Sequence, residues 1–341
     1  MLKDFAVCLL LLLQCVVSPS SLRVLGSMES ESRAPEVDSG ASATQPGGQP
    51  SVQSSGDLGF DSHVARPAHS KSHPKVLFDE AHGNADTSGG RYRPFADLIT
   101  SDGYAVRPNS EKLSRSVLKD YQILIVVNAS GPPGQRSASP FSDSECEAVR
   151  DWVKAGGSLL LISDQAPFST AMAGLAERFD VNITKGFTVD PIHHDKGSGD
   201  ETELVFSRDN SLLGDHPITR GRDATERINR IVSFTGTSLK GPVGSIPFLK
   251  LGDTAKDVIP SDVIPSAPGE AAPDPKQTSA AGRAQAIALG FGNGRVVVLG
   301  EAAMLTAQVA LKGFRFGMNV PGIDNRQLAL NIMHWLSGSI K

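Results

Sequence analysis

The chain has 341 residues, of which 39% are hydrophobic and 21% charged, and its formal net charge is -4. This length allows one large domain or two small ones with a sizeable core, and the acidic balance excludes the basic surface typical of nucleic-acid-binding proteins. Two of the three cysteines lie at positions 8 and 15, so Cys146 alone remains in the rest of the chain. A single cysteine excludes a disulfide framework and a multi-cysteine zinc site there.

The first 21 residues have the pattern of a secretory signal peptide. Lys3 precedes an apolar run over residues 5–17, which only Gln14 interrupts, and small polar residues follow. A run of this length is short for a membrane span and typical of a signal-peptide core. The sequence therefore predicts export to the periplasm or the cell exterior. The alternative is a retained membrane anchor, because Asp4 weakens the positive start of the segment.

Residues 22–74 are rich in Ser, Gly, Pro and Gln and show no hydrophobic period. Such a composition buries too little apolar surface to offset the entropy of ordering, so we expect a disordered linker. The domain itself is expected over residues 75–341. Within it, residues 253–282 are again rich in Pro, Ala, Ser and Asp and predict a mobile surface loop.

From residue 75 onward, strand and helix patterns alternate. Strands are predicted at residues 75–79, 104–106, 122–127 and 159–162, and helices at 91–101, 113–118, 143–155 and 169–178. The run Leu159 to Ile162 has no polar break and lies between two helical patterns, as expected of a central strand buried on both faces. Alternation at this spacing predicts an α/β fold with a doubly wound, mainly parallel sheet.

The second half predicts added edge strands. Short extended runs occupy residues 204–206, 231–234 and 246–249, and Asn293-Gly294 between two apolar runs is a hairpin signal. The glycines at 290–294 are followed by a strand and not by a helix, which excludes a dinucleotide-binding fingerprint. A closing helix is expected over residues 327–336.

Polar residues follow several of the predicted strands. In open α/β sheets, ligands bind outside the carboxyl ends of the strands, so these residues are expected to converge on one site. We place a further segment, residues 300–325, over this site as a lid. The candidate ligand-binding residues are Asp79, Glu80, His82, Asn128, Asp164, Gln165, Glu301, Gln308 and Asn319.

Four short segments resemble a widespread domain of unknown function. They are residues 78–84 (Phe-Asp-Glu-Ala-His-Gly-Asn), 156–164, 215–218 (Asp-His-Pro-Ile) and 234–236 (Phe-Thr-Gly). That domain is similar to the class I glutamine amidotransferase-like, flavodoxin-related fold, with relatives among gliding-motility transport auxiliary and intraflagellar transport proteins. Amidotransferases carry a catalytic cysteine at the turn after the central strand, where this chain has Asp164-Gln165. The resemblance implies the fold and the position of the pocket, without glutaminase activity.

Two functions follow from these residues. The first is an exported module that binds a small polar ligand, or an envelope partner protein, at the strand ends, with no cofactor and no metal. The alternative is a hydrolase in which Asp79, His82, Asp164 and Glu301 act as acid and base groups, with or without a metal held also by His193, His194 and Asp195. Neither set has a diagnostic metal-binding spacing.

Overall fold

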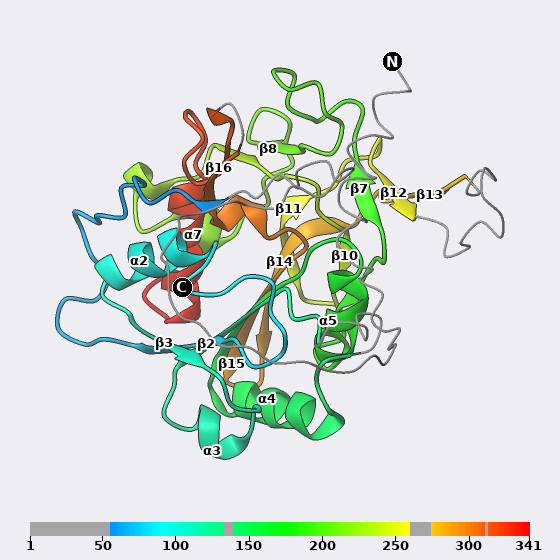
Figure 1. The fold of residues 1–341 in the computed structure, drawn as a ribbon. Helices are drawn as coiled ribbons and strands as arrows, with labels where there is room; N and C mark the ends of the chain where they lie inside the picture. The colour runs from blue at the N-terminus through cyan, green and yellow to red at the C-terminus, as the bar shows by residue number, and fades with distance from the viewer. Residues whose placement is uncertain (1–54, 132–138, 260–273, 311–312) are drawn as a thin grey trace, which may run out of the picture. The chain divides into compact units, whose positions relative to one another are not determined.

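A nine-stranded sheet organises the domain (Figure 1). The computed structural model describes residues 55–131, 139–259, 274–310 and 313–341. The strands lie in the order β3-β2-β4-β5-β15-β14-β10-β6, and β11 also pairs with β14. Their bounds are β2 Lys75–Asp79, β3 Ala105–Asn109, β4 Ile123–Val127, β5 Ser158–Ile162, β6 Asn182–Ile183, β10 Leu239–Lys240, β11 Ile246–Lys250, β14 Ala284–Phe291 and β15 Gly294–Leu299.

The first half of this sheet is parallel and the second half antiparallel. The pairs β2/β3, β2/β4, β4/β5 and β5/β15 are parallel, whereas β14 pairs antiparallel with β15, β10 and β11. The hairpin predicted at Asn293-Gly294 joins β14 to β15. The predicted fold class, a mainly parallel α/β sheet with added edge strands, is thus confirmed.

Both faces of the parallel half are covered by helices, as the unbroken apolar runs predict. Alternate residues of β5 belong to different cores: Leu160 and Ile162 pack with one, and Leu159 and Leu161 with the other. Helices α2 (Arg93–Ser101) and α7 (Asn325–Leu336) cover the first face, and α4 (Asp143–Ala155) and α5 (Phe168–Glu177) the second (Figure 1). The remaining helices within the described residues are short: α3 Arg115–Leu118, α6 Pro217–Arg220, η1 Ala224–Glu226 and η2 Ala303–Leu305.

Helix α4 is followed by a short turn and then by strand β5. Ser142 and Glu145 form the predicted capping box at its start. At its end, Gly156 adopts a φ of 128°, and a Cβ on Gly157 would lie 2.3 Å from the Trp152 ring. The two glycines are therefore required by the turn. Cys146 lies on the inner face of α4, where burial raises the pKa of its thiol above the ordinary value, as expected of a packing residue.

The described residues also form three small sheets. They are β1 (Ser55–Gly56) with β16 (Ala307–Val309) and β17 (Arg315–Gly317); β7 (Phe187–Val189) with β12 (Lys256–Ile259) and β13 (Lys276–Ser279); and β8 (Val205–Ser207) with β9 (Arg230–Val232). Strands β12 and β13 lie inside the segment predicted as a mobile loop, so that prediction is wrong at both ends of the segment. Its middle, residues 260–273, lies outside the described residues.

The predicted linker is also too long. Residues 1–54, including the predicted signal peptide, lie outside the described residues, but residues 55–74 belong to the domain. The main-chain amide of Val64 donates to the Ser101 hydroxyl at 2.9 Å, and that of Ala68 donates to the Asp102 carboxylate at 2.8 Å. Within the described residues, no helix is both long and apolar enough to cross a membrane.

Candidate functional site

The carboxyl ends of β2, β4, β5 and β15 lie next to one another in the sheet and carry four of the predicted residues. Asp79 ends β2, and Asn128 follows β4 directly. Leu299 of β15 pairs with Ile162 of β5, so Glu301 and Asp164, each two residues further on, come to the same level of the sheet. The predicted convergence along one edge is therefore present. The residues divide into two separate clusters.

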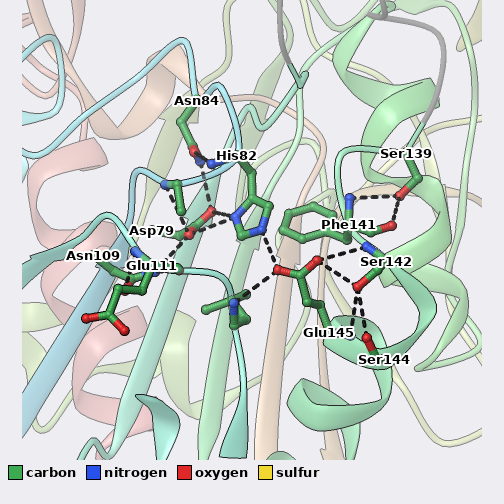
Figure 2. A network of polar contacts seen from close by, with 12 residues as sticks. Asp79, His82, Asn84, Asn109, Glu111, Ser139, Phe141, Ser142, Ser144 and Glu145 are labelled. Carbon is green, nitrogen blue, oxygen red and sulfur yellow. Dashed lines mark hydrogen bonds and ion pairs between the residues drawn. The ribbon is translucent and has the colours of Figure 1, made fainter. Parts of the chain in front are cut away.

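The first cluster is built around His82 (Figure 2). Its Nδ1 lies 2.8 Å from Asp79 Oδ2, and its Nε2 lies 2.9 Å from Glu145 Oε1. All three side chains are buried. Asn84 and Asn109 also donate to Asp79, at 3.3 Å each, and the Ser142 hydroxyl donates to Glu145 at 2.8 Å.

Two carboxylates favour the charged form of the imidazole. Burial alone would lower the pKa of His82, but the hydrogen bonds and charges of Asp79 and Glu145 outweigh burial and raise it. Burial would likewise raise the pKa of Glu145, but hydrogen bonds from Ser142 and His82 lower it to about 2. Because carboxylates only accept, both imidazole nitrogens donate, and neither is free to act as a base or bind a metal. The cluster thus joins β2 to α4 as a structural element.

The second cluster surrounds Asp164 and Glu301. Glu301 is wholly buried and accepts hydrogen bonds from the amides of Ala303 at 2.5 Å and Met304 at 2.7 Å, at the start of η2. Asp164 is half-buried, and the amide of Gln165 donates to it at 3.0 Å. The Gln165 side chain, oriented so that its nitrogen donates, bonds the Thr235 carbonyl at 2.6 Å and also Asp164.

Both carboxyl groups of this cluster have raised pKa values. Burial, and next the charge of Asp86, raise the pKa of Asp164 to about 7, against the opposing hydrogen bond from Gln165 and the charge of Arg91. Burial and the charge of Asp164 raise the pKa of Glu301 well above its ordinary value. Paired carboxyl groups of this kind at strand ends are candidates for a functional site.

Three neighbours of Asp164 were not predicted from the sequence. Asp86 accepts from Asn128 Nδ2 at 2.8 Å and from Arg91 Nε at 2.7 Å, and the Tyr92 hydroxyl donates to the Ala302 carbonyl at 2.7 Å. They come from the loop between β2 and α2. The available signal was the polar run after Asp79, which continues to Asp86 and Arg91.

The other predicted residues lie elsewhere. Glu80 accepts from the amide and hydroxyl of Ser88, at 2.8 and 2.6 Å, and so holds the loop after β2. Gln308 lies in β16, where its amide donates to Thr306 at 2.6 Å. The Asn319 amide donates to Asp57 at 3.0 Å and to the Gln308 carbonyl at 3.2 Å. The Asn319 side chain thus holds the small β1/β16/β17 sheet together, and its role in a lid over Asp164 stays a prediction.

The loop histidines do not join either cluster. His193 Nδ1 lies 2.9 Å from Asp190 Oδ2, and Asp195 accepts from Arg230 at 2.7 Å. Across the described parts of the chain, His, Cys, Asp and Glu nowhere form a group of three that could hold a metal ion.

A shallow depression of about 640 Å³ adjoins the second cluster through Arg91, which lines the depression and bonds Asp86. Its volume falls within the ordinary range of ligand pockets. The other lining residues are Gly56, Asp57, Leu58, Gly59, Gly89, Gly90, Arg93 and Val309.

Fold and site together define an α/β domain with a mainly parallel central sheet, with carboxylic acids and no cysteine at the turn after the central strand. Its fold is similar to that of the mmIFT52 N-terminal domain, at a TM-score of 0.54 and 14% identity, over 77% of this chain and 97% of that domain. The likeness to intraflagellar transport proteins predicted from the motifs is thus confirmed at the level of the fold.

Two further structures are more distant. One is a putative ThuA-like protein from Parabacteroides merdae, with a TM-score of 0.40, 12% identity and coverage of 79% of this chain and 91% of the other. The other is a putative GMP synthase protein from Thermoplasma acidophilum, with a TM-score of 0.39, 11% identity and coverage of 79% and 96%. No family model and no curated protein sequence matches the chain.

Proposed function

We propose that this domain binds a small polar ligand at the strand-end crevice around Asp164. One observation carries the proposal: the half-buried Asp164, whose pKa is raised to about 7, lies beside the buried carboxyl group of Glu301. A fold retains such destabilising groups where function requires them. Asp164, Gln165 and Asn128 are the proposed ligand contacts, and Glu301 acts on the ligand through its effect on Asp164.

A hydrolase is less well supported. The two nitrogens of His82 are taken by Asp79 and Glu145, so this imidazole is not available as the base for a nucleophile. Ser163, which precedes the turn, is wholly buried and donates to the Asp164 carbonyl. Cys146 lies buried in α4, remote in sequence from the turn where amidotransferases carry their nucleophile.

A ligand-dependent melting screen of the full chain tests the binding function. We expect at least one polar metabolite to raise the melting temperature of the wild type, and Asp164→Asn to abolish that increase. The matched control is Asp253→Asn, the same change at an exposed carboxylate, which should respond like the wild type. A ligand that stabilises Asp164→Asn as strongly as the wild type would place binding elsewhere and refute the proposal.

We also propose that the protein is exported, with an envelope protein as the alternative partner at the same edge. The support is the apolar run at residues 5–17. Amino-terminal sequencing of the protein from its native host should find a chain that begins near residue 22. A chain that begins at Met1 in the membrane fraction would support the retained anchor, and Met1 on a protein in the cytoplasmic fraction would contradict export.

A further inference from the structure

The charges around Asp164 are unbalanced. In the described parts of the chain, Arg91 is the cation whose charge acts on Asp164, but its guanidinium is paired with Asp86 at 2.7 Å. No ion pair is found there for Asp164 or for Glu301. Glu301 is already satisfied by the amides of Ala303 and Met304. Asp164 is thus left as a half-buried carboxyl group without a cationic partner at the strand ends.

Asn128 adds a second, independent feature. Its side chain is buried, with 2% exposure, and its amide nitrogen donates to Asp86 and contributes a hydrogen bond to Asp164. Its Oδ1 atom has no hydrogen-bond donor. A buried acceptor without a donor costs roughly 1–3 kcal/mol. A ligand that supplies a donor would remove this cost.

The unused groups beside Asp164 are its own carboxyl group and the Oδ1 atom of Asn128, and both are acceptors. The carboxyl group can also carry a negative charge. Resting on the proposed function, we infer that the ligand presents a primary ammonium group, which binds between Asp164 and Asn128. An ammonium group carries three donors and one positive charge in a compact shape, so it can satisfy the carboxylate and the amide oxygen together.

The ammonium ligand must compete with the proton on Asp164. The groups that act on Asp164 are the amide of Gln165, Asp86, Arg91 and Asn128, and the charge of Asp164 in turn acts on Glu301. With the pKa of Asp164 at about 7, roughly one molecule in ten carries the carboxylate at pH 6, and roughly nine in ten at pH 8. The affinity for an ammonium should therefore rise about tenfold across this interval.

Three small probes of similar size test the inference on the full chain by ligand-observed NMR titration at pH 6 and pH 8. They are ethanolamine, ethylene glycol and glycolate, which present an ammonium, a hydroxyl and a carboxylate. We expect ethanolamine to bind with a Kd on the order of millimolar, as its size allows, and about tenfold more tightly at pH 8. Asp164→Asn should abolish this binding, and Asp253→Asn should leave it unchanged.

The outcomes separate the inference from the proposed function. Binding of glycol or glycolate that requires Asp164, without binding of ethanolamine, would overturn the ammonium inference and leave the polar-ligand function standing. Binding of ethanolamine that Asp164→Asn does not affect would also overturn the inference. If none of the three probes binds and the melting screen finds no Asp164-dependent ligand, both the inference and the proposed function fail.

Discussion

His82→Ala is expected to lower the free energy of unfolding by about 3–5 kcal/mol, the usual cost of removing one partner of a buried ion pair. The variant leaves Asp79 and Glu145 buried without the cation that now lies 2.8 and 2.9 Å from them. Urea unfolding at pH 5.5 measures the effect. His63→Ala is the control, because His63 is an exposed histidine of the same domain.

The pH dependence of this effect follows from the two pKa shifts. The folded pKa of His82 is raised above 6.5, so its contribution is complete below pH 6.5 and is lost as the pH rises through the raised value. The folded pKa of Glu145 is lowered from 4.5 to about 2, so its contribution is complete above pH 4.5 and is lost as the pH falls toward 2. The difference between wild type and His82→Ala should therefore be largest between about pH 5 and 6.5 and smaller at pH 9.

A second measurement combines His82→Ala with the removal of a carboxylate charge that His82 neutralises. His82→Ala combined with Glu145→Gln should be more stable than the sum of the two single variants predicts, because the double variant leaves one fewer unpaired charge in the interior. A His82→Ala variant within 1 kcal/mol of the wild type at pH 5.5 would show that the cluster does not hold β2 against α4.

The elements of the core could be predicted from the sequence because local patterns determine them. The run Leu159 to Ile162 has no polar break, and the structure buries alternate residues of it in the two cores. The capping box of Ser142 and Glu145 needs only a spacing of three residues. Strand order then brings Asp164 and Glu301 together, although they lie far apart in the chain.

The contacts that could not be predicted join residues with no local relationship. Glu145 was recognised as a helix cap, but its bond to His82 crosses 63 positions of the chain. Residues 55–74 lack a hydrophobic period, yet Val64 is buried in the core and the amides of this segment donate to residues such as Ser101 and Asp102. No periodicity reveals these isolated contacts. Asn319 was predicted to belong to the site because it is polar and lies in a turn, and such residues are as often structural.

Asp164→Asn is expected to stabilise the domain at pH 8 while it abolishes ligand binding. The folded pKa of Asp164 is raised from 3.8 to about 7, so the native state holds a proton that the unfolded chain has released. The stability of the wild type must then fall as the pH rises from about 4 to beyond 7, and asparagine has no such loss. The pKa of Asp164 rises by about 3, and a change of one in pKa corresponds to about 1.4 kcal/mol. The gain in the free energy of unfolding from Asp164→Asn is therefore at most about 4 kcal/mol.

The measured gain should lie below that bound for two reasons. Asp164 is half-buried, so solvent lowers the free energy needed to ionise its carboxyl group. The charge of Asp164 also acts on Glu301, so the destabilisation belongs to the pair of carboxyl groups and not to Asp164 alone. We expect Asp164→Asn to be at least about 1 kcal/mol more stable than the wild type in urea unfolding at pH 8, and equal to it at pH 4. Asp253→Asn should match the wild type at both values. Equal stability of Asp164→Asn and wild type at pH 8 would mean that the Asp164 carboxylate does not destabilise the folded state. The observation on which the proposed binding site depends would then be lost.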